Sequence, residues 1–261
     1  MKLGSARVLL TNDDGITAKG LEVLRKAIEP YVAEVWVVAP ENEQSGTGHS
    51  LTLRRPLRIR KISKNRFAVD GTPTDCVLLA ISEIMSDRLP HVILSGVNRG
   101  GNLGGDITYS GTVAAAMEGT LLGIKSIALS QVYRNHEDIE WDTAENWSGP
   151  VVKMLFSLDF PEGVLMNVNF PPIKSASVVG IAAVSQGQRK IGDELQAGLD
   201  PRGDKYFWIG SQRTDGYIVK GTDMAAIQND MISVTPLGLD FTHMPTLKKL
   251  RLLSENVGKN I

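Results

Sequence analysis

The fold class is decided by residues 7–39, which read RVLLTNDDGITAKGLEVLRKAIEPYVAEVWVVA. Residues 7–11 form a short, nearly all-apolar segment that ends in the turn-forming cluster NDDG at 12–15. Apolar residues then recur at helical spacing until Pro30, and residues 34–39 are apolar at nearly every position. Strands that are apolar on both faces are typical of parallel sheets covered by helices. The stretch therefore predicts a strand, a helix and a second, parallel strand.

The same alternation continues along the chain. Residues 57–62 and 67–70 alternate in polarity and predict a hairpin, whereas residues 131–147 are polar and predict a connecting loop. The other expected elements are strands over residues 91–95, 124–130 and 164–170, a helix that begins at Pro73 with Thr72 as its cap, a helix that begins near Ser110, and a helix over residues 150–158. Strands that alternate with helices predict an α/β fold with a doubly wound, mostly parallel sheet.

The character of the sequence changes after residue 170. We expect residues 1–170 to form the α/β domain and residues 171–261 a C-terminal region with short strands and a terminal helix. Short strands are expected over residues 178–184, 206–210 and 232–235. Residues 205–209 read KYFWI, and such large apolar residues beside turns often pair with another chain. Oligomerisation is the expected role of this region, and packing on its own domain is the alternative.

Composition excludes several classes of protein. The 261 residues include 28 basic and 29 acidic side chains, a net charge of −1 that argues against binding to a nucleic-acid duplex. The single Cys76 excludes a disulfide framework and a cysteine-based zinc site. No signal peptide precedes the first strand, and no apolar run approaches the roughly 18 residues of a membrane span. We therefore expect a cytoplasmic protein that has no membrane partner.

Four oxygen-bearing side chains follow strands whose carboxyl ends should meet. Asp13 and Asp14 follow the first strand, Ser45 lies in the loop after the second, and Asn98 follows the strand that ends at Ser95. Loops at the carboxyl ends of neighbouring parallel strands converge on one crevice. An all-oxygen set of this kind suits Mg²⁺ or Mn²⁺ and does not suit zinc. For the two aspartates alone, simple turn formation is an equally good interpretation, although adjacent carboxylates repel each other without a cation.

The segment 96–112 predicts an anion site. It contains five glycines before Tyr109 and then Ser110-Gly111-Thr112, which opens a helix. Backbone N–H groups at a helix N-terminus bind anions, and glycines permit close approach, so phosphate is the expected guest. Tight turns in a long loop are the alternative reading of the glycines.

Other catalytic patterns are missing from the sequence. It has no Gly-x-Ser-x-Gly elbow, no Walker motif, and no Gly-x-Gly-x-x-Gly after its first strand. Its two aspartates are adjacent, whereas the haloacid-dehalogenase pattern places them two positions apart. The four histidines do not show a metal-binding spacing. A serine hydrolase, an ATPase and a dinucleotide-dependent enzyme are therefore disfavoured.

The chain closely resembles the SurE family of metal-dependent nucleotidases. The matching stretches are LLTNDDGI (residues 9–16), VVAPENEQSG with HSLT (37–52), GTPTDCV (71–77), SGVNRGGNLGGDITYSGTVAAAMEG (95–119) and, more weakly, TDMAAIQNDMISVTPL (222–237). They occur in the family's order and cover most of the chain, and the stretch 95–119 is the most specific. Residues 229–231 read NDM where family members often carry Gly-Tyr, a departure that affects the expected assembly.

The resemblance implies a fold, an activity and a set of site residues. It implies a Rossmann-like catalytic domain and a C-terminal region that builds homodimers or homotetramers through exchanged segments. The implied activity is hydrolysis of nucleoside monophosphates at the 5′ position, with the 3′ position as an additional reading that stays open, and with one Mg²⁺ or Mn²⁺ per subunit. The implied metal ligands are Asp13, Asp14, Ser45 and Asn98, with the two aspartates as catalytic residues. The implied phosphate contacts are Asn102, Ser110, Gly111 and Thr112.

Two alternatives to this function stay open from the sequence. The substrate could be short-chain polyphosphate in place of, or beside, nucleotides. The chain could also bind a nucleotide and a metal without turning anything over. Release of phosphate from each substrate would separate these possibilities.

Overall fold

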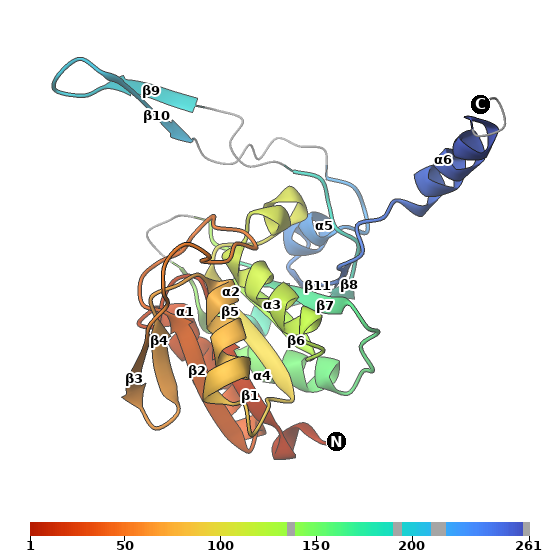
Figure 1. Cartoon of the computed structure of the whole chain (residues 1–261). Helices are drawn as coiled ribbons and strands as arrows, with labels where there is room; N and C mark the ends of the chain where they lie inside the picture. Colours follow the sequence, from red (N-terminus) through yellow and green to blue (C-terminus); the bar gives the residue numbers. More distant parts are fainter. Residues whose placement is uncertain (135–138, 190–194, 210–217, 258–261) are drawn as a thin grey trace.

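A computed structural model describes residues 1–134, 139–189, 195–209 and 218–257 of the chain. Its centre is one nine-stranded sheet (Figure 1), in which β4, β2, β1, β5, β6 and β7 run parallel and β3 and β11 run antiparallel to their neighbours β4 and β7. In sheet order the strands are β3 (Ile59–Ser63), β4 (Arg66–Val69), β2 (Glu34–Pro40), β1 (Arg7–Thr11), β5 (Val92–Arg99), β6 (Ser126–Gln131), β7 (Val164–Phe170), β11 (Met231–Gly238) and β8 (Gly180–Ala183). The predicted mostly parallel, doubly wound α/β fold is confirmed.

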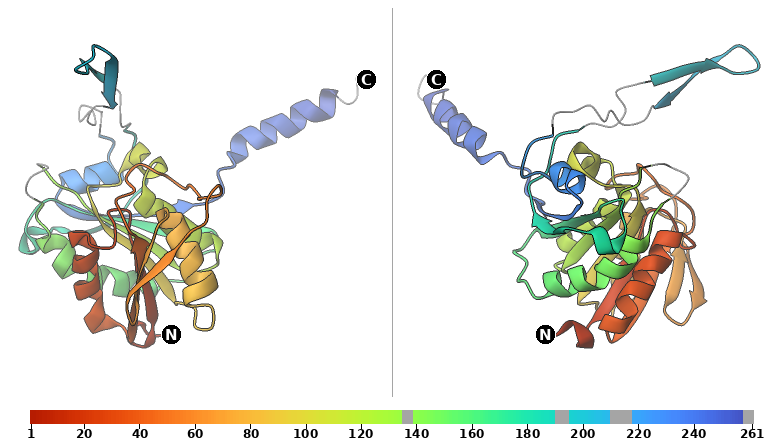
Figure 2. Two further views of the ribbon diagram at one scale, coloured as in Figure 1. Left: turned by 60° about the vertical axis from the view of Figure 1, so that its left-hand side comes forward. Right: turned by 180° about the vertical axis from the view of Figure 1, so that it is seen from behind.

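Helices cover both faces of this sheet (Figures 1 and 2). The helices α1 (Lys19–Ile28) and α4 (Asp142–Phe156) pack on one face, and α2 (Pro73–Leu79) and α3 (Gly111–Leu121) pack on the other. Strand β1 serves both cores, because Val8 and Leu10 join the cluster with α1 and α4 while Leu9 joins the cluster with α2. All three side chains are fully buried, as expected for a central parallel strand.

The predicted helix start at Thr72 is confirmed in its atomic detail. The Thr72 hydroxyl accepts a hydrogen bond from the backbone N–H of Asp75 at 3.1 Å, and the Asp75 carboxylate accepts one from the backbone N–H of Thr72 at 2.8 Å. This reciprocal pair is a capping box, with Pro73 in the first helical position. The predicted hairpin is also present as β3 and β4, and β4 continues the parallel sheet beside β2.

The loop expected over residues 131–147 is wrong in its second part, because α4 begins at Asp142 and contains Pro150 within it. Residues 135–138 of that expected loop lie outside the described residues. The early turns of α4 carry small or polar residues that tertiary packing buries, among them Thr143, Ala144 and Ser148. Gly149 lies so close to the ring of Tyr31 that a Cβ would come within 2.3 Å of it. Close packing therefore stabilises the first half of α4, where the sequence pattern for a helix is weak.

The C-terminal part both completes the sheet and extends away from it. Strands β8 and β11 come after residue 170 in the chain and join the central sheet. The expected division of the chain into residues 1–170 and 171–261 stays a prediction. The hairpin of β9 (Leu195–Leu199) and β10 (Lys205–Ile209) and the helix α6 (Met244–Val257) project from the body in separate directions (Figures 1 and 2). The sequence analysis did not predict β9 or the short helix α5 (Asp223–Gln228). Among the described helices, none has the length and apolar character needed to cross a membrane.

The packing of α1 against β5 leads to a first testable prediction, which concerns Gly20. A Cβ at this position would lie 1.9 Å from the backbone oxygen of Val97 and 2.9 Å from the ring of Trp141. Gly20→Ala should therefore lower the free energy of unfolding by about 3 kcal/mol, measured by urea denaturation. Gly238→Ala is the matched control, because no heavy atom lies within 4 Å of the added methyl group there. Equal stability of the two variants would contradict this account of the helix packing.

Candidate active site

The carboxyl ends of β1 and β5 lie side by side and bring two predicted site segments together. Thr11 and Ser95 are register partners in adjacent parallel strands. Beyond them, the carboxylate of Asp14 accepts a hydrogen bond from the backbone N–H of Arg99 at 3.1 Å. Asn98 precedes Arg99 and donates its side-chain N–H to the carbonyl of Gly100 at 2.9 Å. The side-chain oxygen of Asn98 is thus the group that a cation would bind.

Asp13 joins these strand ends to the N-terminus of α3. Its side chain is buried, and its Oδ1 accepts a hydrogen bond from the Thr112 hydroxyl at 2.5 Å. A Cβ on Gly111 would lie 2.8 Å from the Cβ of Asp13 and 3.0 Å from its Oδ2. Glycine at position 111 therefore permits the first turn of α3 to approach the carboxylate. The predicted metal ligand Asp13 and the predicted phosphate contacts Gly111 and Thr112 lie together.

The loop that carries Ser45 is held over the same place. The backbone N–H of Gln44 donates to the carbonyl of Asp13 at 2.8 Å, and the backbone N–H of Gly48 donates to the carbonyl of Tyr109 at 3.1 Å. Nε2 of His49 lies 2.9 Å from the Glu118 carboxylate, and this hydrogen bond ties the loop to α3. The Ser45 hydroxyl itself donates to the carboxylate of Glu43 at 2.8 Å. Ser45 thus lies on a loop bound to both Asp13 and the start of α3.

Burial makes the carboxyl groups of both aspartates weaker acids than an exposed aspartate. Burial raises the pKa of Asp13 from 3.8 to about 6, with the hydrogen bond from Thr112 opposing this shift and the charge of Asp14 adding to it. Burial also raises the pKa of Asp14, against the hydrogen bond from the Arg99 backbone. Holding both carboxylates ionised in this place costs free energy, which a bound cation would offset.

The donor set fits a divalent cation of the hard, oxygen-binding kind. Two carboxylates, one hydroxyl and one amide oxygen are ligands that Mg²⁺ and Mn²⁺ accept, with water completing the shell. Within the described ranges, no group of three or more His, Cys, Asp or Glu side chains is placed to hold a metal. The assignment of Asp13, Asp14, Ser45 and Asn98 as metal ligands stays a prediction that this donor chemistry supports.

The first turn of α3 has the features of an anion site. Ser110 is the N-cap residue, and its hydroxyl accepts a hydrogen bond from the backbone N–H of Val113 at 3.1 Å. The backbone N–H groups at the start of a helix have no partners within the helix and carry the positive end of its dipole. Ser110, Gly111 and Thr112 therefore offer the geometry in which a phosphate group is bound.

Asn102 is held by a separate set of polar side chains on the sheet. Its side-chain N–H donates to the hydroxyl of Ser130 at 2.8 Å, and its backbone N–H donates to Oδ1 of Asn169 at 2.8 Å. Its carbonyl accepts hydrogen bonds from the side chains of Asn167 at 2.8 Å and Asn169 at 3.1 Å. The residue is buried by β6 and β7. A side-chain amide nitrogen carries two hydrogens, so Asn102 can bind Ser130 and still donate once more.

The residues that support the loop containing Asn102 were not predicted from the sequence. Asn167 and Asn169 alternate with apolar residues in β7 and are fully buried. Two asparagines on one face of an otherwise apolar, two-sided strand are costly unless they are hydrogen-bonded, and that pattern could have identified them. Asp223 and Arg189 also contact the loop, but from segments that the sequence did not connect with it.

Comparison with known proteins places the whole chain beside one family. The family model described as Survival protein SurE matches residues 8–193. A protein of Paramagnetospirillum magneticum named 5′-nucleotidase SurE is 53% identical over 246 residues, which cover 94% of this chain and 95% of the relative. A protein of Rhodospirillum rubrum with the same name is 49% identical over 251 residues, covering 95% and 96% of the two chains.

A solved structure extends this similarity to three dimensions. The SurE protein from Aquifex aeolicus superposes with a TM-score of 0.84 at 40% sequence identity. The match covers 95% of this chain and 99% of that one. The sheet, its helices and the loops at its carboxyl edge are therefore similar to those of a known structure over nearly their full length.

The raised pKa of Asp13 leads to a second prediction, which concerns the metal-free chain. A folded-state pKa raised to about 6 means that the folded protein binds a proton that the unfolded chain has released, so stability falls as pH rises from about 4 to about 6. Asp13→Asn should therefore raise the free energy of unfolding above pH 6, by up to about 3 kcal/mol, and should have little effect below pH 4. Thermal unfolding in EDTA across this pH range measures the effect.

The control for this prediction is Asp159→Asn, which removes an exposed carboxylate beyond the end of α4. Addition of Mn²⁺ should raise the melting temperature of the unmodified chain more than that of Asp13→Asn. Identical melting temperatures for the unmodified chain and Asp13→Asn at every pH would contradict the assigned burial of this charge.

Proposed function

The chain belongs to the SurE family, and from this premise we propose that it is a divalent-metal-dependent 5′-nucleotidase, which hydrolyses nucleoside monophosphates to nucleosides and phosphate. The observation that carries the proposal is the contact between Asp13 and Thr112. It joins the paired carboxylates to the N-terminus of α3, so one place offers both oxygen ligands for a cation and N–H donors for a phosphate. The 5′-nucleotidase names of its relatives support the same activity.

Asp13, Asp14, Ser45 and Asn98 would hold one Mg²⁺ or Mn²⁺ per subunit. When bound, such an ion polarises a phosphoryl group and lowers the pKa of a bound water. The two aspartates also supply the carboxylates that can take the proton of the attacking water. Thr112 keeps the Asp13 carboxylate in place by its hydrogen bond to Oδ1.

The start of α3 and Asn102 would bind the phosphate group. The backbone N–H groups of Gly111 and Thr112 and the dipole of α3 stabilise negative charge on the non-bridging oxygens, charge that changes during displacement of the leaving group. The second hydrogen of the Asn102 side-chain amide provides a further donor. Ser110 shapes this turn as its cap and presents its own hydroxyl beside it.

We further propose that the enzyme acts as a homodimer or homotetramer. The hairpin of β9 and β10 projects from the body, and its apolar side chains are solvent-exposed in a single chain, with Phe207 at 61%, Trp208 at 69% and Ile209 at 73%. Exposed apolar surface of this kind is typical of an interface. The helix α6 extends separately and exposes Leu250, Leu252 and Leu253. The cytoplasmic location expected from the sequence stays a prediction.

The third prediction tests the activity. Phosphate release should occur from nucleoside monophosphates with Mg²⁺ or Mn²⁺ and should stop in EDTA. Asp13→Asn and Asp14→Asn should each reduce kcat by at least about 100-fold while the far-UV circular dichroism spectrum stays unchanged. The substrate panel should include a short polyphosphate and an aryl phosphate.

Each other outcome of that assay has a definite meaning. Release of phosphate from polyphosphate alone would show that polyphosphate, and not a nucleoside monophosphate, is the substrate. Tight nucleotide binding without release would favour the binding-only alternative. Full activity in both aspartate variants would remove the assignment of the metal ligands.

The fourth prediction concerns assembly. Light scattering at micromolar concentration should give a mass of at least two chains, and Trp208→Glu should shift the equilibrium towards the single chain, because it places a charge in the apolar interface. Leu158→Glu is the control, since Leu158 is also an exposed apolar residue, at 48%, and lies beyond the end of α4. A single-chain mass for the unmodified protein would contradict the proposal.

A further inference from the structure

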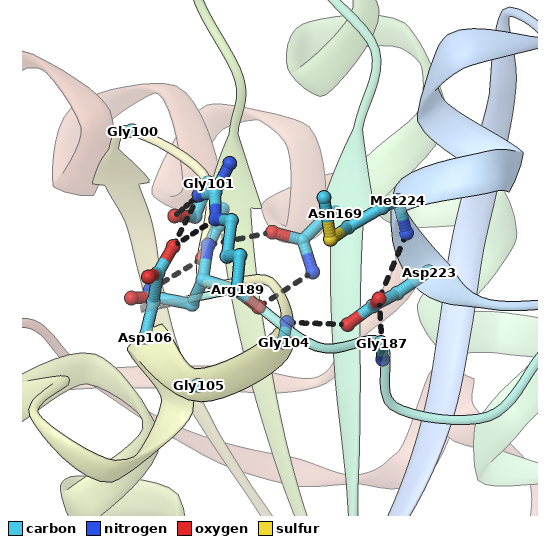
Figure 3. A network of polar contacts seen from close by, with 12 residues as sticks. Gly100, Gly101, Gly104, Gly105, Asp106, Asn169, Gly187, Arg189, Asp223 and Met224 are labelled. Carbon is cyan, nitrogen blue, oxygen red and sulfur yellow. Dashed lines mark hydrogen bonds and ion pairs between the residues drawn. The ribbon is translucent and has the colours of Figure 1, made fainter. Parts of the chain in front are cut away.

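The loop between β5 and α3 has to be held from outside, because it has little structure of its own. Residues 100–103 are irregular, and Gly104 begins a short 3-10 turn with a positive φ of 54°. Backbone groups that are buried need hydrogen-bond partners, and residues 100–103 lie outside any strand or helix that would supply them. Strands β6 and β7 hold Gly100 and Asn102, and the partners of Gly104 come from the C-terminal part of the chain (Figure 3).

Asp223 is the central partner. It is the first residue of α5 and is completely buried. Its Oδ2 accepts a hydrogen bond from the backbone N–H of Gly104 at 2.8 Å, and its Oδ1 accepts hydrogen bonds from the backbone N–H groups of Gly187 and Met224, each at 2.8 Å. Figure 3 shows the carboxylate between Gly104 on one side and Gly187 on the other. One side chain thus joins three segments of the chain.

The segment that contains Gly187 reinforces this contact. The side-chain N–H of Gln186 donates to the carbonyl of Gly104 at 2.8 Å, and the backbone N–H of Gly105 donates to the carbonyl of Arg189 at 3.0 Å. The guanidinium of Arg189 forms an ion pair with the buried carboxylate of Asp106 (Figure 3). Both backbone groups of Gly104 are therefore fixed by side chains from elsewhere in the chain.

A carboxylate suits this junction better than any neutral side chain. Both of its oxygens accept hydrogen bonds, and hydrogen bonds to an ionised acceptor are stronger than those between neutral groups. An asparagine at this position would present one N–H₂ group towards a backbone N–H, so at least one segment would lose its partner. In a fully buried place that loss has the full cost of an unsatisfied polar group.

We propose that Asp223 is a positioning residue of the phosphate site: by fixing Gly104 it sets the path of the loop and hence the place of Asn102, two residues earlier. Asn102 is fixed on its other side by Ser130, Asn167 and Asn169. The loop is thereby held at two points, on the sheet and on α5. This inference rests on the proposed function for the role of Asn102 and assigns to Asp223 no contact with the substrate.

The fifth prediction follows for Asp223→Asn. The KM for a nucleoside monophosphate and the inhibition constant of inorganic phosphate should both rise by about tenfold, the effect of losing one hydrogen bond to a buried charged group. The dissociation constant for Mn²⁺ should stay within about twofold, because Asp13, Asp14 and Ser45 lie on other loops and Asn98 lies in β5, where pairing with β6 holds it. A purely structural role would instead reduce the amount of active enzyme and leave KM unchanged.

A control and a second variant make the test decisive. Asp142→Asn also removes a carboxylate that accepts a backbone N–H, from Ser175 at 2.6 Å, but it lies at the start of α4 away from the loop and should not alter KM. Gln186→Ala removes, at an exposed residue, the other side-chain hydrogen bond to Gly104, which goes to its carbonyl group. It therefore tests whether fixing Gly104 affects phosphate binding if Asp223→Asn does not fold. It should raise KM by about threefold.

The outcomes separate this inference from the proposed function. An unchanged KM and an unchanged phosphate inhibition constant in a folded Asp223→Asn would overturn the role of Asp223. If that variant does not fold, unchanged values in Gln186→Ala would overturn the link between Gly104 and the phosphate site, on which the role of Asp223 depends. If the unmodified chain releases no phosphate from any nucleotide, the proposed function fails by itself. Calorimetric titration with inorganic phosphate then still compares the unmodified chain with each variant, where weaker binding by the variant supports the role and equal binding overturns it.

Discussion

The burial of the Asp13 carboxylate between the end of β1 and the first turn of α3 is the constraint on which the rest of the site depends. A charge in this place is tolerated because Thr112 donates a hydrogen bond to it and because Gly111 lets the helix approach. The same closeness brings the positive end of the α3 dipole to the Asp13 carboxylate. A parallel sheet places the loops after β1, β2 and β5 at one edge, so the fold itself assembles the residues around that charge.

The C-terminal part of the chain is needed to complete this site. Strand β7 supplies the asparagines that hold Asn102, and β11 pairs with β7 on its other side. Helix α5 comes directly before β11 and supplies Asp223. The sheet is therefore more than a support for the loops on the N-terminal strands, because its later strands and α5 hold the glycine-rich loop from the opposite side.

The sequence was sufficient for the features that depend on local patterns. Strand β1, the capping box at Thr72 and the start of α3 near Ser110 were predicted because short-range hydrogen bonding and apolar spacing determine them. The first half of α4 was not, because its helix signal before Pro150 is weak and tertiary packing, such as that of Gly149 against Tyr31, stabilises it. The contact of Asp223 with Gly104 joins residues 119 positions apart, and no local pattern reports such a pairing. The predicted site residues could be named because they lie at strand ends, whereas the residues that position them could not.

One segment of the chain holds the glycine-rich loop and comes shortly before the projecting hairpin. Residues 185–189 hold Gly104 and Gly105 through Gln186 and Arg189, and β9 begins at Leu195, a few residues later. The residues that hold the glycine-rich loop are therefore near in sequence to the hairpin that we propose for assembly. Asp223 joins the loop to this segment, because its carboxylate accepts hydrogen bonds from the backbone N–H groups of both Gly104 and Gly187.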